Sequence, residues 1–291
     1  MTAVRRLTSM VGLALVTGVA SLSRTARAQD SLPRWLKDRG DAISSSMFST
    51  YIHPGELVVF PFFEYLRDNN REYQPREFGL GPEIDYRGKF HSTAEQIFLG
   101  YGVNDWLALE FEMAHISAEL TKSPSDGFLP PGKIQESGLT DIEAQVRGRA
   151  IRETSRWPEF FLYSEFVART QRAKFLISEN YWDIKPGVGF IKGFGFGTLT
   201  ARINLEYNHE EKKLDLGELS VEYLKRISPN FRLFLDFEGG ETGSLDEWVT
   251  VQGFDLRLSN SVFLKFDNTL GISSKADDWV PQVGLMWAPK W

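Results

Sequence analysis

The feature that most constrains the fold of this chain is an alternation of polar and apolar residues that recurs along most of its length. In residues 198–207, Ile203 and Leu205 fall on one face, whereas Arg202 and Glu206 fall on the other. A β-strand sends successive side chains to opposite faces, so this stretch reads as a strand with one apolar and one polar face. The pattern predicts an all-β fold.

Twelve segments show this alternation, and each is near the ~10 residues that a tilted strand needs to cross a bilayer. Their approximate bounds are 56–66, 93–102, 105–115, 139–150, 158–168, 181–191, 196–208, 218–227, 231–238, 247–258, 261–270 and 280–288.

The links between the segments alternate in length. Short turn sequences such as 103–104 and 259–260 follow even-numbered segments, whereas the long links 67–92 and 116–138 follow odd-numbered ones. Outer-membrane barrels have short periplasmic turns and longer outer loops. The even count places both ends on the short-turn side. We therefore predict a single antiparallel transmembrane β-barrel of about 12 strands with periplasmic termini, located in the outer membrane and surrounded by its lipid.

Alternation alone also fits a soluble β-sandwich. Two features favour the membrane barrel. The polar faces carry charges of both signs, as a barrel lumen does, and aromatic residues such as Trp106, Trp182, Tyr207 and Trp279 stand near segment ends, where interfacial girdles belong.

The N-terminus has the three zones of a secretory signal peptide. Arg5 and Arg6 form a basic start, residues 10–20 are apolar but too short to span a membrane, and Ala26-Arg27-Ala28 is a small-residue cleavage site. An uncleaved N-terminal anchor is the alternative, which the length disfavours. We expect a signal peptide over 1–28, an N-terminal periplasmic or plug segment over 29–55, and the barrel over 56–291. The segment 29–55 reads equally as a loose tail.

If the polar faces point inward, charged side chains line the lumen and set its electric field. The candidate pathway residues in the middle segments are Glu110, Glu112, Asp141, Glu143, Arg147, Arg202, Glu206, Glu222 and Asp236. Their acid excess favours cations. The leading interpretation is passive passage or uptake of small solutes of unknown identity. A closed structural barrel that acts through the outer loops 67–92 and 116–138 is the alternative.

Other chemistries find little support. The chain has no Cys, its net charge is −6, and its four His show no metal-ligand spacing, so we expect no nucleic-acid partner, metal or cofactor. A hydrolase of lipids at the barrel rim is a third hypothesis, with His115 and Ser137 as the pair, although no nucleophile motif surrounds Ser137. We expect no enzymatic activity.

Several stretches resemble Gram-negative outer-membrane β-barrel proteins that are loosely grouped with transporters of the phenol-degradation barrel type. These stretches are 51–65 (YIHPGELVVFPFFEY), 98–111 (FLGYGVNDWLALEF), 136–144 (ESGLTDIEA), 222–228 (EYLKRIS) and 271–283 (GISSKADDWVPQV). The resemblance implies an outer-membrane barrel and no particular solute. The aromatic C-terminal residue Trp291 resembles the end that the barrel assembly machinery reads, which makes that machinery an expected partner through the C-terminal strand. Pro289 departs from the pattern, because proline does not suit a central strand.

Overall fold

The computed structural model describes residues 32–171, 174–178, 182–209, 212–241 and 244–290. The predicted signal peptide, 1–28, and the C-terminal aromatic residue Trp291 lie outside the described residues. Within them, no helix is long and apolar enough to cross a membrane.

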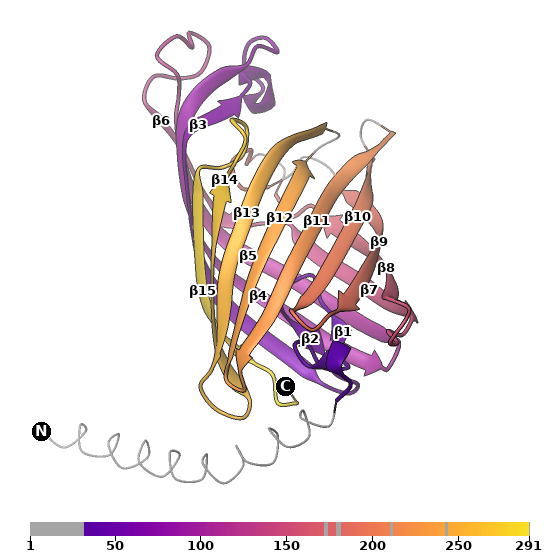
Figure 1. Ribbon diagram of the computed structural model, residues 1–291. Coiled ribbons are helices and arrows are strands. Elements are labelled where there is room, and N and C mark those ends of the chain that lie inside the picture. The colour runs from indigo at the N-terminus through magenta and orange to yellow at the C-terminus, as the bar shows by residue number, and fades with distance from the viewer. Residues whose placement is uncertain (1–31, 172–173, 179–181, 210–211, 242–243, 291) are drawn as a thin grey trace, which may run out of the picture.

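The described strands form a closed antiparallel barrel (Figure 1). Its wall has twelve strand positions, one of which is shared by two short strands. The strands are β3 (Leu57–Tyr73), β4 (Tyr86–Asn104), β5 (Leu107–Thr121), β6 (Lys133–Leu139), β7 (Ile142–Ile151), β8 (Glu159–Ala168), β9 (Asp183–Gly193), β10 (Thr198–Asn208), β11 (Lys213–Ser228), β12 (Phe231–Glu241), β13 (Ser244–Arg257), β14 (Val262–Gly271) and β15 (Trp279–Trp287). Consecutive strands pair with each other, except that β7 pairs with β5 instead of β6. β15 pairs with β3 to close the wall, with Trp287 opposite Val59. The predicted fold class is confirmed.

The two faces of the wall differ as the alternation predicts. On β12, Leu235 and Phe237 are 49% and 46% exposed, whereas Phe234 and Asp236 are 3% and 0% exposed. The exposed apolar residues face outward, where a bilayer would cover them, and the buried ones face the lumen.

The fourth strand position of the wall is divided between β6 and β7, although the sequence predicts one strand over 139–150. Both β6 and β7 pair with β5, and Thr140 and Asp141 stand between them. Asp141 accepts hydrogen bonds from the Thr170 amide at 2.9 Å and the Ser178 hydroxyl at 2.6 Å. These tertiary contacts stabilise the interruption between the two strands. They cannot be predicted from the alternation of polar and apolar residues.

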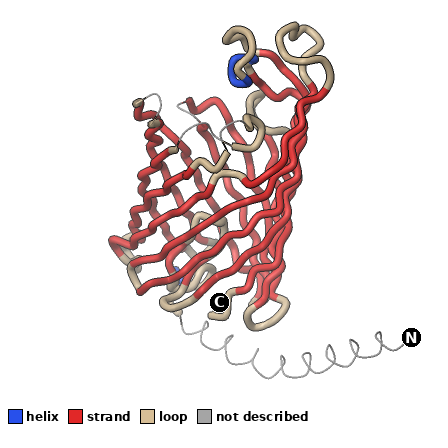
Figure 2. The backbone as a smooth tube through the Cα atoms, turned by 180° about the vertical axis from the view of Figure 1, so that it is seen from behind, coloured by secondary structure: helices blue, strands red, loops and turns tan. Residues whose placement is uncertain are grey.

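The expected outer loops 67–92 and 116–138 are wrong in extent, because the strands continue through much of both. β3 and β4 stay paired up to Tyr73 and Tyr86, and β5 and β6 up to Thr121 and Lys133. The alternation fades there because neither face of a sheet above the bilayer must be apolar. This outer extension, formed by 67–92 and 117–138, rises beyond the other strands (Figures 1 and 2). A 3-10 helix, η2 (Pro75–Phe78), lies in its first link.

Short turns join the strands at the opposite end of the barrel, where the described N-terminal segment and the C-terminus also lie (Figure 1). The turn between β4 and β5 is Asp105-Trp106, and the one between β11 and β12 is Pro229-Asn230. We call this the periplasmic end, because short turns face the periplasm in outer-membrane barrels.

Candidate functional site

The segment before the first barrel strand folds into the periplasmic half of the lumen. It starts with a short 3-10 helix, η1 (Arg34–Leu36), and continues as a hairpin of β1 (Ile43–Ser44) and β2 (Tyr51–Ile52). We call residues 43–52 the N-terminal hairpin. Its Ile43 and Ile52 are 1% and 0% exposed.

Apolar side chains of the wall pack against one side of this hairpin. Val58, Phe60 and Phe62 of β3 point into the lumen, and they form a buried cluster with Ile43 and Ile52. The inward face is therefore apolar at this height, in contrast to the charged lining expected from the middle segments. Burial of these side chains supplies the hydrophobic part of the hairpin's attachment.

Carboxylates of the wall accept hydrogen bonds from the hairpin tip. Glu110 of β5 accepts bonds from the Ser46 amide at 2.8 Å and from its hydroxyl at 2.5 Å. Glu222 of β11 accepts a bond from the Ser49 amide at 2.8 Å, and Asp255 of β13 accepts one from the Ser49 hydroxyl. Hydrogen bonds to ionised acceptors are stronger than neutral ones, so these contacts fix the tip.

Basic side chains bind the carbonyl groups of the same tip. Arg147 donates to the Ser45 carbonyl at 2.8 Å and Arg202 donates to the Ser46 carbonyl at 3.0 Å. The Lys265 ammonium donates to the Phe48 carbonyl. Polar groups of the tip thus find partners from several strands around the barrel, as buried backbone requires.

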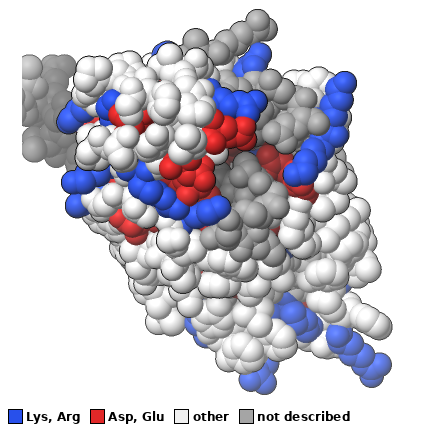
Figure 3. All heavy atoms as spheres, turned by 90° about the horizontal axis from the view of Figure 1, so that it is seen from above, with Lys and Arg blue, Asp and Glu red and all other residues white. Residues whose placement is uncertain are grey.

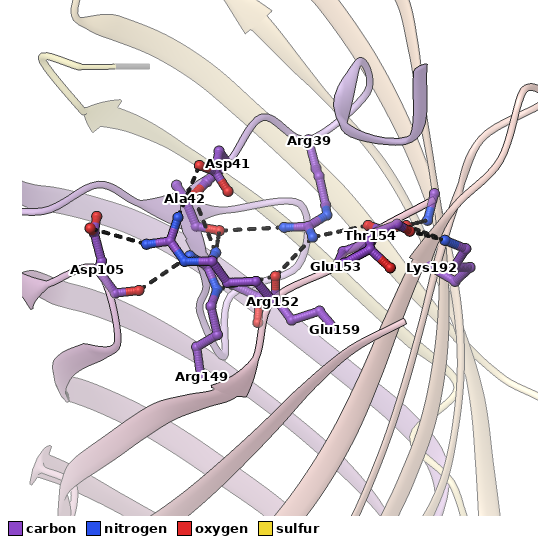
Figure 4. A network of polar contacts seen from close by, with 12 residues as sticks. Arg39, Asp41, Ala42, Asp105, Arg149, Arg152, Glu153, Thr154, Glu159 and Lys192 are labelled. Atoms are coloured by element: carbon purple, nitrogen blue, oxygen red, sulfur yellow. Dashed lines mark hydrogen bonds and ion pairs between the residues drawn. The ribbon is translucent and has the colours of Figure 1, made fainter. Parts of the chain in front are cut away.

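A buried ionic network anchors the base of the segment (Figure 4). The Arg39 guanidinium lies 3.1 Å from Glu153 and 2.8 Å from Glu159, and all three side chains are almost fully buried. Arg149 lies 3.1 Å from Glu159 and also donates to the Ala42 carbonyl. Burial lowers the pKa of Arg39, but Glu159, Tyr51 and Glu153 together outweigh the effect of burial and hold that pKa above its ordinary value.

A cavity of about 390 Å³ lies in the lumen beyond the hairpin tip. Its floor includes Ser46 and Met47, and its described lining holds seven glutamates and three basic residues. The glutamates are Glu112, Glu143, Glu165, Glu206, Glu218, Glu238 and Glu247, and the bases are Arg147, Lys185 and Arg202. Arg202 is paired, at 2.8 Å to Glu218 and 3.2 Å to Glu238, which leaves five glutamates and two basic residues on the described lining.

A second cavity, of about 410 Å³, continues toward the outer end. It shares Glu112, Glu143, Lys185 and Glu206 with the first. One side is again acidic, and the other is apolar, with Phe175, Leu176 and Ile177 from the link between β8 and β9. Acidic and basic side chains surround this end when the molecule is viewed from above (Figure 3).

The nine predicted pathway residues separate into three groups. Glu110, Arg147, Arg202 and Glu222 contact the hairpin. Glu112, Glu143 and Glu206 line both cavities.

The other two make contacts with the wall itself. Asp141 lies at the break in the fourth strand position and also lines the second cavity, and Asp236 accepts hydrogen bonds from the Ser220 hydroxyl at 2.9 and 3.0 Å. Whether any of the nine contacts a solute stays a prediction.

Five residues that hold the N-terminal segment were not predicted from the sequence, namely Arg39, Ser46, Ser49, Glu153 and Glu159. The serine-rich run 44–50 was the available signal, because small side chains leave backbone groups free to meet a charged wall.

Among the described residues, no hydrogen bond joins His115 and Ser137, the hypothetical pair for lipid hydrolysis. The Ser137 hydroxyl shares a hydrogen bond of 2.9 Å with the Ser117 hydroxyl, and His115 stands opposite Leu139. Among the described residues, no group of three or more His, Asp or Glu could hold a metal ion. The charged side chains of the lumen can attract and orient ions.

Comparison with known proteins supports the architecture. No protein-family model matches the sequence. No curated protein matches it either. An outer-membrane channel from Pseudomonas putida F1 is similar in structure, with a TM-score of 0.61 at 12% identity, covering 84% of this chain and 99% of the channel. The translocator domain of the autotransporter NalP from Neisseria meningitidis has a TM-score of 0.50 at 10% identity, covering 96% of this chain and 97% of that domain.

These likenesses concern the fold. Together with the closed wall and its outward apolar band, they establish that this chain is a β-barrel of the outer-membrane type, located in the outer membrane.

Proposed function

We propose that this chain is an outer-membrane channel for small solutes, that its lumen favours cations, and that the N-terminal hairpin limits flow. The observation that carries the proposal is the acid-lined cavity that ends at the hairpin tip. The solved Pseudomonas putida structure of the same fold is that of an outer-membrane channel, which agrees with this assignment.

The charge of the lining gives the direction of the selectivity. Glu112 and Glu143 belong to both cavities, whereas Lys185 is the one basic residue that both share in the described lining. Rings of carboxylates favour cations, and the low dielectric of a protein wall strengthens the effect. A small cation entering from the outer end therefore meets a favourable field before it reaches the hairpin.

The hairpin accounts for restricted flow. Ser49 and Thr50 are each 2% exposed, and the cavity between the tip and the wall strands β7, β10 and β11 has a volume of only about 20 Å³. That is room for about one water molecule. Passage into the periplasm requires this segment to shift, and its polar contacts can exchange with water as it does.

Ion selectivity tests the proposal directly. In a planar bilayer with a KCl gradient, the reversal potential of the purified protein should report a preference for K⁺. The double variant Glu112→Gln/Glu143→Gln should lose most of this preference. Glu83→Gln is the matched control, because Glu83 is an exposed acid of the outer extension paired with Arg76. A preference for Cl⁻, or an unchanged potential in the double variant, would contradict the proposal.

The outer extension favours a second candidate function, binding of a partner at the cell surface. It carries the exposed apolar side chains Leu80, Ile84 and Phe128, which are 41%, 48% and 48% exposed. Deletion of residues 76–84 separates the two functions. A protein that acts only as a channel keeps its conductance without these residues. A barrel that acts by surface binding shows no conductance with or without them, and the deletion abolishes its binding of the partner.

A further inference from the structure

A bowl of about 540 Å³ lies at the periplasmic rim, between η1 and the turn that joins β9 to β10. It is separate from the lumen cavities, and its volume is within the range of small-ligand sites. Its lining comprises Arg34 and Trp35 of η1, Ser155, and residues 192–196, which include Lys192, Phe194 and Phe196.

Glycines of the turn shape this bowl. A Cβ atom at Gly193 would lie 1.7 Å from the Trp35 carbonyl oxygen, so only glycine lets η1 pack this closely on β9. A Cβ atom at Gly195 would lie 2.1 Å from the Arg34 guanidinium, which therefore rests on the bare backbone of the turn. The sequence G-F-G-F-G at 193–197 thus positions a cation beside two phenylalanine rings.

Arg34 has no hydrogen-bond or ion-pair partner among the residues that the structure describes. Lys192 differs from it, because its ammonium donates to the Thr154 carbonyl at 2.7 Å and lies 3.0 Å from Glu153. Within the described part of the chain the Arg34 guanidinium is therefore open to an external anion, and its planar fork suits two oxygens of a phosphate group.

The apolar side of the bowl continues the surface that faces the bilayer. Phe190, Lys192 and Phe194 alternate along the outward row of β9 and its turn, and Phe190 is 49% exposed. The Phe194 and Phe196 rings stack at 5.0 Å and are 38% and 58% exposed. Aromatic rings at this height belong to the interfacial girdle of a barrel, where acyl chains meet headgroups.

We propose that this bowl binds one anionic phospholipid of the periplasmic leaflet, with the phosphate on Arg34 and the acyl chains along Phe194 and Phe196. The ligand is a lipid rather than free phosphate because the cation and the lipid-facing rings belong to one concave surface. This site is additional to the solute pathway.

The bound lipid also stabilises the N-terminal segment. Glu153 joins the bowl to the base of that segment, because its carboxylate contacts Lys192 at 3.0 Å, the Gly193 amide at 2.8 Å and Arg39 at 3.1 Å. A lipid that holds η1 against the turn therefore favours the position in which the hairpin fills the lumen. This part of the proposal rests on the proposed function, whereas the lipid site does not.

Native mass spectrometry of the intact protein tests the site. We would add phosphatidylglycerol or phosphatidylcholine of identical acyl chains and count bound lipids over a concentration series. Phosphatidylglycerol should bind at lower concentration than phosphatidylcholine, and Arg34→Ala should weaken its binding on the order of tenfold. Arg34→Lys should keep part of the affinity. Lys37→Ala should keep all of it, because Lys37 is an exposed cation of the same segment outside the bowl. Equal binding of the two lipids, or equal losses in the Arg34→Ala and Lys37→Ala variants, would overturn the proposal.

The link to the hairpin needs its own measurement. The chain has no Cys, so a Ser46→Cys variant carries one thiol at the tip. Phosphatidylglycerol should slow labelling of this thiol in the Ser46→Cys variant, which retains Arg34. It should leave the labelling rate unchanged in the Ser46→Cys/Arg34→Ala variant. If the lipid leaves the labelling rate unchanged both with and without the Arg34→Ala substitution, the link to the hairpin is refuted. The lipid-binding measurements would still test the site independently.

Discussion

The backbone amide of Ser49 donates a 2.8 Å hydrogen bond to the Glu222 carboxylate, although 173 residues separate the two in the sequence. This bond joins the tip of the N-terminal hairpin to the far wall of the barrel. It shows that charges pointing into the lumen have two roles here. Some hold the hairpin, and others, such as Glu112 and Glu143, remain along the cavity.

Arg39→Ala should destabilise the protein by about 3 kcal/mol, because Glu153 and Glu159 would stay buried with less compensation. The apparent thermal midpoint of the detergent-solubilised barrel measures this. Arg152→Ala is the control, since the Arg152 side chain is 36% exposed and its pairs with Asp41 and Asp105 should contribute at most ~1 kcal/mol. Equal losses would show that the buried network does not anchor the segment.

His53 predicts a loss of stability in mild acid. It lies in the periplasmic link between β2 and β3, where burial lowers its pKa below the ordinary value of 6.5, Lys290 acts in the same direction and Glu56 opposes both. The unfolded state then binds the proton more readily than the folded state, so stability present above pH ~6.5 is lost as the pH falls toward the folded pKa.

The matching measurement compares thermal midpoints at pH 7.5 and pH 5.0. The wild-type protein should lose more stability between them than His53→Gln does. Identical pH dependence in both would remove His53 as a contributor.

Leu205→Lys should cost ~2–4 kcal/mol if Leu205 lies near the middle of the bilayer. Its side chain is 42% exposed on the outward face of β10. The neighbouring substitution Glu206→Lys points into the acid-lined cavity, where a new cation meets opposite charge, so it should cost much less. Unfolding in urea with lipid vesicles present measures both. A larger cost for Glu206→Lys would reverse the assignment of the two faces.

The barrel could be predicted from the sequence because its strands follow a local rule. On β12 the outward row of Leu233, Leu235 and Phe237 reads as apolar whatever the rest of the chain does, since lipid surrounds it. The alternation of short and long links, which can also be read locally, predicted the antiparallel order of the strands. Above the bilayer this rule lapses, which is why the outer ends of β3 and β5 were not foreseen.

The position of the hairpin could not be predicted by such a rule, because distant residues determine it. Arg39 and Glu153 are 114 residues apart, and nothing local marks them as partners. Besides the serine-rich run 44–50, a second signal was present in the sequence. The run Leu57-Val58-Val59-Phe60 is apolar on both faces, and a strand of that kind needs a partner inside the barrel as well as lipid outside.

A reversible lock on the hairpin tests the central claim most directly. The Thr50 hydroxyl lies 3.8 Å from the Met286 sulfur, so the two side chains are in contact, and Thr50→Cys/Met286→Cys introduces one thiol on the hairpin and one on the wall without changing any charge. Single-channel conductance of this variant in a planar bilayer should fall when the two thiols are oxidised to a disulfide and recover when the disulfide is reduced. The preference for cations should be the same before oxidation and after reduction. Conductance that is unchanged by oxidation would contradict the account, because solutes would then pass without moving the hairpin.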